Sequence, residues 1–514
     1  MPGEAFREGP HGDDRFAGSA DRLAELAGVA SALAGNLIHH VQALLEDLVD
    51  DSGEVAREAE ALVDAASNRF SDARDLLRVA PRLSRVVTTC LGIVARYRLH
   101  GALQGAQTDS SGEPPASLER LHRRSARRLR LLCEELRGGV LKLGQFASSR
   151  MDLLPEAYVT ELSKLQDRVP PVPSEALAAR MERELGPDWG EHFASFEIEP
   201  LAAASLAQVH GATLADGTPV AVKLLLPDIE EEVDADLAAL RLLAPVLRDA
   251  LPRVDLETLI GGLGHALRRE LDLGAEAAAA RQLREAFADD PDVIVPRVHA
   301  QASSRGVLVL ERIEGERLID FLDGCETRGE QGARDRDRLC EILIRSFCAQ
   351  ILVHGIFQGD PHPGNFLVLR GPRGPRLAML DFGCVQRYEA PLRRQYAALA
   401  VAILARDEAR MAEGFAALGF RSRDGDPAGL RAYAEMFLEA FRQGVEFADA
   451  GDHVEHVARI LALTETNPIV EIPEHFVLLG RVFASLGGLL KRYPPRIRLS
   501  ALLQPELAAA LHIE

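Results

Sequence analysis

One pair of polar motifs constrains this chain more than any other feature of its sequence. The first motif is Asp360-Pro-His-Pro-Gly-Asn365, and the second is Asp381-Phe-Gly383. The carboxylate of Asp360 can accept a proton from a hydroxyl group or align a water molecule. Asn365 and Asp381 offer the oxygen ligands that Mg²⁺ prefers. The spacing therefore predicts a magnesium site beside a general base.

The residues around and between these motifs predict how they are held. Phe366–Leu369 and Arg376–Leu380 are two apolar runs on either side of a Gly-Pro-Arg-Gly-Pro turn. This pattern is typical of a β-hairpin and places Asp381 directly after a strand. His362 stands between two prolines and is predicted to shape its loop rather than to bind a metal. An Asp and an Asn in this order, followed by Asp-Phe-Gly, are typical of the catalytic and metal-binding loops of protein kinases.

A second hairpin precedes these motifs. The β-type runs 206–214 and 219–226 are separated by Ala215-Asp216-Gly217-Thr218, and Asp-Gly between such runs is a strong hairpin signal. Side chains alternate across a strand, so Ala221 and Lys223 share one face. An alanine leaves room for an adenine ring, and a lysine reaches the α- and β-phosphates. Both residues are therefore predicted to bind a nucleotide.

The turn before this hairpin consists of small residues, Ala202-Ala203-Ala204-Ser205, at the position where kinases have a glycine-rich phosphate loop. We assign these four residues to the nucleotide site. Alanine disfavours positive φ, so its amides are expected to wrap the phosphates less completely than those of glycine. Gly261–Gly264 lies in a helical pattern and does not follow a strand, so it is not predicted to be a phosphate loop.

The strand lysine needs a carboxylate partner from a helix. Residues 228–288 are predicted to be helical and contain the candidates Glu270, Asp272 and Glu276. On one continuous helix, 272 and 276 share a face, whereas 270 lies about 120° away from 276. The next apolar run, 307–313, is predicted to be one buried strand that ends in charge. We also assign Glu311, within this run, to the nucleotide site.

The order of these elements indicates an α+β protein with a two-lobed, protein-kinase-like fold, in which a small β-rich N-lobe precedes a helical C-lobe. Residues 335–355 are predicted to be helical, and so is almost all of the chain beyond residue 390, with breaks near 425–427 and 468–473. Few residues separate Gly383 from the next helix, near 391–404. An activation segment that docks a peptide has little room there, so the sequence predicts an unusual phosphate acceptor or hydrolysis.

The composition excludes some classes of protein. The formal net charge is -19 and the pI is about 5.3, which lacks the basic footprint of a general nucleic-acid binder. The six cysteines contain no Cys-x-x-Cys pair and are expected to be free thiols. No secretory signal and no run long enough to span a membrane is visible. We expect a cytoplasmic protein, with peripheral association at the inner face of the membrane left open.

The N-terminal part is predicted to be a separate helical extension. Residues 1–106 carry leucines at helical spacing, and the polar segment 107–117 is predicted to be a linker. His39 and His40 point in different directions on a helix, so they are not predicted to bind a metal. Beyond the linker, 118–195 begins with a helix that has arginines on one side. They either bind anions or form a solvated face paired with carboxylates: Arg120, Arg123, Arg124, Arg127 and Arg128.

Taken together, these residues resemble the UbiB/AarF family of atypical kinase-like ATPases, which are linked to ubiquinone and other isoprenoid-lipid metabolism. The resemblance spans about residues 118–500. Lys142-Leu-Gly-Gln145 matches the KxGQ motif of the family, and Glu270 with Asp272 matches its ExD motif. Other segments resemble further family motifs, including the alanine-rich loop: Asp152–Pro155, Leu165–Pro170, Ala202–Ser205, Gln208–His210 and Leu478–Leu490.

The resemblance implies roles for several of these residues. It implies that Glu276 is the partner of the strand lysine. It also implies that the KxGQ segment folds over the nucleotide site, with Lys142 and Gln145 as regulatory residues near Glu270 and Asp272. ATP and Mg²⁺ are the implied cofactors, with ATPase activity or phosphorylation of a small molecule and poor activity on proteins.

The chain departs from the family pattern in two places. Gln358 stands where many bacterial members have a histidine, so different support of the catalytic loop is expected. The chain stops at Glu514 without the spanning helices that end some members. An integral membrane anchor is therefore not predicted.

These observations predict an ATP-binding atypical kinase or ATPase that acts in, or regulates, isoprenoid-quinone or other lipid metabolism. A lipid or quinone-like ligand is the predicted partner besides ATP. The alternative is a nucleotide-sensing pseudokinase that regulates a partner complex and docks through residues 1–106. Lys223 and Asp360 are assigned to catalysis. The kinase-like domain is predicted to comprise an N-lobe at 196–313 and a C-lobe at 314–514.

Overall fold

The computed structural model describes residues 116–148, 155–165, 172–250, 256–423, 430, 469–471 and 473–512, together with 82, 85, 86, 88–90, 92–97 and 100. Several predictions lie outside the described residues: the extension up to residue 81, the pair His39–His40, most of the linker at 107–117, the break at 425–427, and most of the segments Asp152–Pro155 and Leu165–Pro170.

The chain forms two compact units that alternate along the sequence. Unit 1 comprises Met1–Leu177, Ala202–Gln208 and Leu225–Leu271. Unit 2 comprises Ala178–Leu201, Val209–Leu224 and Asp272–Glu514. Most of the helical stretch that follows the predicted nucleotide hairpin therefore groups with the KxGQ-bearing helices.

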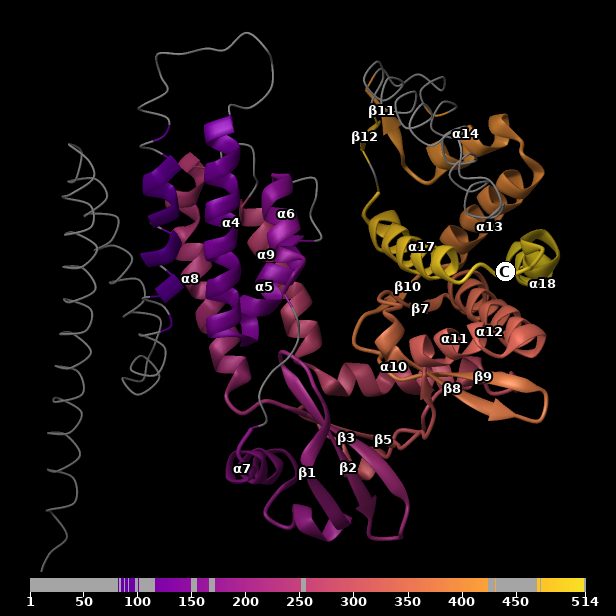
Figure 1. The fold of residues 1–514 in the computed structure, drawn as a ribbon, viewed down its shortest axis with the longest axis horizontal. Coiled ribbons are helices and arrows are strands. Elements are labelled where there is room, and N and C mark those ends of the chain that lie inside the picture. The colour runs from indigo at the N-terminus through magenta and orange to yellow at the C-terminus, as the bar shows by residue number, and fades with distance from the viewer. Residues whose placement is uncertain are drawn as a thin grey trace, which may run out of the picture. The chain divides into compact units, whose positions relative to one another are not determined.

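Unit 1 is a bundle of helices (Figure 1). They are α4 (Ala116–Leu136), α5 (Gly138–Ser148), α6 (Glu156–Leu162), α8 (Ile229–Ala250) and α9 (Leu256–Glu270). Helix α5 packs against each of the other four. Apolar side chains and buried thiols make up its core: Val86, Cys90, Leu132, Cys133, Val140, Leu141, Leu162 and Leu165.

The helical pattern that starts near residue 118 breaks before the KxGQ motif, which the sequence did not predict. Helix α4 ends at Leu136, and Arg137 and Gly138 take positive φ angles of 55° and 52°. The guanidinium of Arg82 donates to the carbonyl oxygen of Arg137 at 2.9 Å and pairs with the buried carboxylate of Asp236 at 2.7 Å. An arginine from the predicted N-terminal extension thus holds the turn between α4 and α5.

Most of the first sheet belongs to unit 2 and contains the predicted nucleotide hairpin. Its strands are β1 (Phe193–Ala203), β2 (Ala207–Leu214), β3 (Pro219–Leu225) and β5 (Val307–Glu311), in the order β1-β2-β3-β5. In the β2–β3 turn, Gly217 takes a φ of 87°, and the carboxylate of Asp216 accepts a hydrogen bond from the backbone N–H of Thr218 at 2.9 Å. The Asp-Gly hairpin prediction is therefore confirmed.

The predicted helix at 228–288 is three helices, and only the last, α10 (Leu273–Ala286), belongs to unit 2. Asp272 is the N-cap of α10, where its carboxylate accepts a hydrogen bond from the backbone N–H of Ala275 at 3.0 Å. The prediction that 272 and 276 share a face of one helix is wrong for Asp272, because a cap residue precedes the first turn.

A second sheet in unit 2 carries the hairpin between the two polar motifs. Its order is β4-β9-β8-β6, formed by Val293–Ile294, Gly374–Met379, Phe366–Gly371 and Glu316–Arg317 respectively. β8 and β9 pair in antiparallel fashion, which confirms this hairpin as well. The short strands β7 (Ile356–Gln358) and β10 (Val385–Arg387) pair with each other and flank the two motifs.

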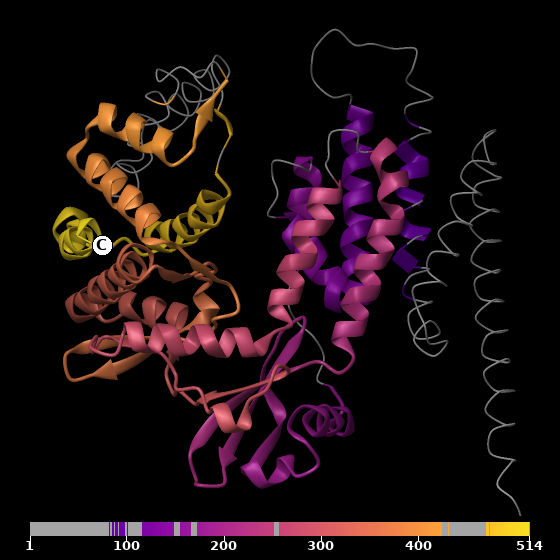
Figure 2. The same ribbon diagram turned by 180° about the vertical axis from the view of Figure 1, so that it is seen from behind.

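Helices make up most of the rest of unit 2 (Figure 2). They are α11 (Leu318–Glu326), α12 (Gly329–Cys348) with its π-helical continuation (Ala349–His354), α13 (Ala390–Ala405), α14 (Glu408–Ala417), α17 (Glu474–Arg492) and α18 (Leu499–Leu511). Helix α7 (Ser174–Leu185) precedes the first sheet, and β11 (Arg421–Ser422) pairs with β12 (Ile469–Glu471). Among the described residues, no helix is both long enough and apolar enough to cross a bilayer.

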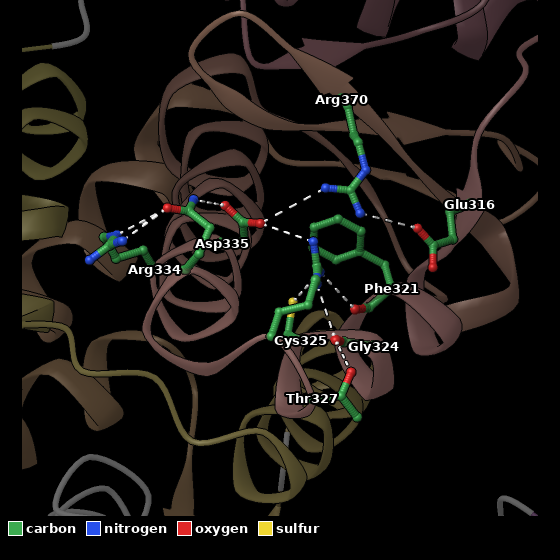
Figure 3. Close-up of polar contacts among 10 residues, drawn as sticks. Glu316, Phe321, Gly324, Cys325, Thr327, Arg334, Asp335 and Arg370 are labelled. Carbon is green, nitrogen blue, oxygen red and sulfur yellow. Dashed lines mark hydrogen bonds and ion pairs between the residues drawn. The ribbon is translucent and has the colours of Figure 1, made fainter.

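A polar cluster fixes the corner between α11 and α12 (Figure 3). Arg328 donates to the carbonyl oxygen of Gly324 at 3.1 Å, pairs with Asp335 at 3.1 Å and lies over the ring of Phe321. Arg370, from β8, lies over the same ring and reaches Asp335 at 4.0 Å. The cluster ties the hairpin that precedes Asp381 to both helices.

Candidate active site

The strand lysine is paired with a buried glutamate. Nζ of Lys223, on β3, lies 2.7 and 2.8 Å from the two carboxylate oxygens of Glu276, on α10. The side chain of Glu276 is 4% exposed and that of Lys223 is 22% exposed. Burial raises the pKa of the Glu276 carboxyl, and the charge of Lys223 opposes that rise. Among the predicted partners Glu270, Asp272 and Glu276, it is Glu276 that pairs with Lys223.

The two faces of β3 differ as the alternation of side chains predicts. Val220, Val222 and Leu224 are fully buried, whereas Ala221 and Lys223 lie on the opposite, half-buried face. A small side chain and a cation therefore share the face that leads to Glu276.

The two polar motifs meet between the short strands. The backbone N–H of Gly359 donates to the carbonyl oxygen of Cys384 at 2.6 Å, and the N–H of Leu380 donates to the carbonyl oxygen of Asn365 at 2.9 Å. Oδ1 of Asp381 lies 4.0 Å from Nζ of Lys223. The lysine, the glutamate and the Asp-Phe-Gly aspartate therefore form one charged cluster.

Asn365 and Asp381 could hold a divalent cation together. The side-chain amide nitrogen of Asn365 donates to the carbonyl oxygen of Asp360 at 3.2 Å, which leaves the amide oxygen for a ligand. Across the described ranges, no three His, Cys, Asp or Glu side chains gather as a metal cage. One carboxylate and one amide oxygen fit Mg²⁺, which is usually held by few protein ligands and by substrate phosphates.

His362 shapes the loop that carries Asp360. Its ring Nδ1 accepts a hydrogen bond from the N–H of Gly364 at 3.1 Å, and its carbonyl oxygen accepts one from the N–H of Asn365 at 2.9 Å. This is the role that the sequence predicted for it.

The other predicted nucleotide residues differ in what they present. Ala202 and Ala203, predicted as part of the turn, are instead the last residues of β1. The chain turns between β1 and β2, where the N–H of Ala204 donates to the carbonyl oxygen of Ala207 at 2.8 Å. Ala202 and Ala204 are exposed, whereas the side chain of Ser205 is fully buried. The carboxylate of Glu311 accepts a hydrogen bond from the N–H of Arg297 at 3.1 Å. Their nucleotide-binding roles stay predictions, as does the position of the turn relative to Lys223, because the two belong to different units.

The KxGQ motif lies in unit 1 and meets half of the ExD motif there. Nζ of Lys142, on α5, lies 3.1 Å from Oε2 of Glu270, on α9, and Gln145 is half-buried on α5. Asp272 belongs to unit 2, caps α10 and lies 3.9 Å from Arg305. The pairing of Lys142 with Glu270 is thus present, and the folding of the motif over the nucleotide site stays a prediction.

The glycine of the KxGQ motif is required by the packing of α5. A Cβ atom at Gly144 would lie 2.5 Å from Cδ1 of Leu165 and 2.9 Å from Sγ of Cys133. Separations this short force a neighbour to move, so no larger residue fits here without rearrangement.

Two residues at the site were not assigned a role by sequence reasoning. The side-chain amide of Gln358 donates to the carbonyl oxygen of Asp381, and its backbone N–H donates to the side chain of Gln350 at 2.9 Å. Gln358 therefore supports the backbone at Asp381. Arg481, on α17, lies 3.0 Å from Asp360. In the sequence, its one visible signal is a charge that interrupts an apolar helix.

A lysine–glutamate pair, an Asp–Asn loop and an Asp-Phe-Gly segment after a hairpin together define a protein-kinase-like protein. Comparisons with known proteins agree with this class. The family model of the ABC1 atypical kinase-like domain matches residues 164–415. The chain is 32% identical to a "Probable protein kinase UbiB" of Marinobacter nauticus over 388 residues, which is 74% of this chain and 69% of that protein.

Another relative of the same name, from Pseudomonas paraeruginosa, is 33% identical over 389 residues, 74% of this chain and 70% of that protein. A solved structure of Rv3197 from Mycobacterium tuberculosis, in complex with erythromycin, matches with a TM-score of 0.53 at 26% identity. That match covers 77% of this chain and 99% of the other. The chain belongs to the family of these UbiB-type proteins, and it carries a match to the ABC1 atypical kinase-like domain.

Proposed function

We propose that the protein binds Mg-ATP and transfers or hydrolyses its γ-phosphate. The observation that carries this proposal is the cluster of Lys223, Glu276 and Asp381, with 2.7 Å between the lysine and the glutamate and 4.0 Å between the lysine and the aspartate. A lysine held by a buried carboxylate keeps its charge in one place, ready to bind the α- and β-phosphates.

The roles of the remaining residues follow from their chemistry. Asn365 and Asp381 would hold Mg²⁺, which neutralises charge on the phosphates when it is bound. Asp360 accepts the proton of the attacking hydroxyl group or water. Glu276 orients Lys223, and Gln358 supports the backbone of Asp381.

The segment after Asp-Phe-Gly favours an acceptor other than a protein. Only the three residues of β10 and a short connection separate Gly383 from α13, which begins at Ala390. Peptide-docking kinases use a longer segment here. The resemblance to UbiB/AarF proteins extends the proposal to an acceptor or effector from isoprenoid-quinone or other lipid metabolism.

Phosphate release from Mg-ATP tests the proposal. Asp381→Asn should abolish release, because it removes the carboxylate that holds the metal. Asp289→Asn is the matched control, since Asp289 is an exposed carboxylate in the loop after α10 and should leave release unchanged. ATP binding without turnover, even with lipids or quinone-like phenols present, would contradict the proposal and favour a nucleotide-sensing pseudokinase.

A further inference from the structure

Helix α17, far along the chain from the catalytic motif, makes two contacts with it. Nη2 of Arg481 lies 3.0 Å from Oδ2 of Asp360. The hydroxyl of Ser485 donates to the carbonyl oxygen of Pro361 at 3.1 Å. Residues 481 and 485 are four positions apart and share one face of a helix. The same helix face therefore holds both the carboxylate of Asp360 and the backbone beside it.

Both ends of α17 are anchored within unit 2. Near its N-terminus, the ring of His475 is hydrogen-bonded to the hydroxyl of Tyr396, on α13, at 2.7 Å. Just after its C-terminus, the hydroxyl of Tyr493 donates to Asp323, on α11. Four described side chains along the helix are buried: Leu479, Val482, Leu486 and Leu489. Arg481 thus extends from a helix that is anchored near both ends, unlike a residue on a loop.

The ion pair itself contributes little to stability. The side chain of Arg481 is 50% exposed and that of Asp360 is 41% exposed. Ion pairs with this much solvent contact contribute little to the net free energy of unfolding. A stabilising role therefore does not explain this ion pair. Its location on Asp360, the predicted proton acceptor, favours a role in catalysis instead.

The contact also distinguishes the two oxygens of the Asp360 carboxylate. Arg481 contacts Oδ2, and within the described ranges no other side chain is hydrogen-bonded to or ion-paired with this carboxylate. A cation beside one oxygen restricts the rotation of the carboxylate and leaves its second oxygen to a reacting group. Alignment of this kind is a main source of rate enhancement in a proton-transfer step.

We propose that Arg481 is a positioning residue for phosphoryl transfer, an inference that rests on the proposed function. It holds Asp360 through Oδ2, so that Oδ1 receives the proton of the attacking oxygen. That oxygen, from a hydroxyl group or water, forms a bond to the γ-phosphorus. The bond from the γ-phosphorus to the bridging oxygen breaks, and ADP leaves with its electron pair. The proton on Oδ1 then passes to solvent.

The test measures steady-state Mg-ATP hydrolysis by the full-length protein. Arg481→Gln should lower kcat about 10- to 100-fold and leave KM for ATP unchanged, because displacing a reacting group by about 1 Å can cost about 100-fold. Arg481→Lys should recover part of the loss, since it keeps the cation and loses the planar fork. Arg492→Gln is the matched control. Arg492 lies on the same helix, is 62% exposed and pairs with Asp323 at 3.4 Å, so this variant should retain wild-type kcat.

A double variant separates positioning from a general structural effect. If Arg481 acts through Asp360, Arg481→Gln should lower the kcat of Asp360→Asn by less than about twofold, because groups that act as a unit are not additive. The unfolding midpoint and the binding of a fluorescent ATP analogue report whether each variant is folded. Should Arg481→Gln fail to fold, Arg481→Lys and Ser485→Ala carry the test, with a several-fold fall in kcat expected for each.

The outcomes separate this inference from the proposed function. Wild-type kcat in a folded Arg481→Gln variant, or losses that multiply fully in the double variant, would overturn the positioning role while ATP turnover stands. If Arg481→Gln does not fold, wild-type kcat in Arg481→Lys and Ser485→Ala would do the same. If the wild-type protein shows no ATP turnover and Asp381→Asn shows none either, both the positioning role and the proposed function are overturned.

Discussion

Removing the charge of Lys223 should destabilise the protein, and the loss should grow as the pH rises. Nζ of Lys223 lies 2.7 and 2.8 Å from the two carboxylate oxygens of Glu276, whose side chain is 4% exposed. Lys223→Met keeps the length of the side chain and leaves a buried carboxylate without its cation. Deleting one partner of a buried ion pair costs about 3–5 kcal/mol, so a loss of this size is expected near neutral pH.

The sign of the pH dependence follows from the pKa of Glu276. Burial raises the pKa of this carboxyl, and Lys223 opposes the rise, so the variant should raise the pKa further. Between the unfolded pKa of about 4.3 and the higher folded value, the folded state keeps a proton that the unfolded state has released. The free energy of unfolding therefore falls as pH rises through this window, by up to about 1.4 kcal/mol per pH unit.

Urea unfolding at pH 5.0 and pH 7.5 measures this effect. Trp189 is the single tryptophan of the chain and packs against the ring of Phe196, on β1, so its fluorescence reports on unit 2. The deficit of Lys223→Met relative to wild type should be larger at pH 7.5 than at pH 5.0, and the slope cannot exceed about 1.4 kcal/mol per pH unit.

A second variant provides the control. In Lys223→Met/Glu276→Leu both charges are absent, and such replacements of buried pairs are often neutral or stabilising. This double variant should regain most of the stability at pH 7.5. An equal deficit at the two pH values, or a double variant no more stable than Lys223→Met, would refute the reasoning.

Two further predictions concern packing and protonation. Gly144→Ala should lower the free energy of unfolding by about 1–3 kcal/mol, because its Cβ would meet Leu165 at 2.5 Å. Gly487→Ala on α17 is the control and should be neutral or stabilising, since nothing lies within 4 Å of its Cβ position. Thermal unfolding that ranked the two variants in the reverse order would contradict this prediction. His210 is fully buried against Phe196, and burial lowers its pKa, so the free energy of unfolding should fall as pH drops below about 6.5. Urea titrations should show a smaller change in the free energy of unfolding between pH 7.5 and pH 5.5 for His210→Asn than for wild type. Equal changes in the two proteins would count against this account.

Both hairpins could be predicted from sequence because the information that forms them is local. Asp216 and Gly217 specify a tight turn through a side-chain hydrogen bond and a positive φ. The alternation of buried and half-buried residues along β3 is likewise visible in a few neighbouring positions. The placement of Lys223 on the face opposite the buried valines follows from these local rules.

Contacts between distant helices could not be predicted in the same way. The periodicity of residues 228–288 predicts helix, but it does not distinguish one helix from three. The start of α10, with Asp272 as its N-cap, therefore could not be read from the periodicity. The pairing of Arg82 with Asp236 joins segments that the sequence assigned to different domains. A charged residue reveals its partner only when the packing of the surrounding helices is known.

The contact of Arg481 with Asp360 is the case in which this limit affects function most. In the sequence, the arginine lies within the apolar segment Leu478–Leu490, whose pattern predicts a helix and nothing about catalysis. The structure adds that the arginine faces the same loop as Ser485, one turn further along α17. Because the short segment after Gly383 leaves little chain to build an acceptor side, a helix from the C-terminal part of the chain is well placed to orient the proton acceptor. In the proposed mechanism Asp360 is the group that accepts the proton, and α17 contacts that group through Arg481.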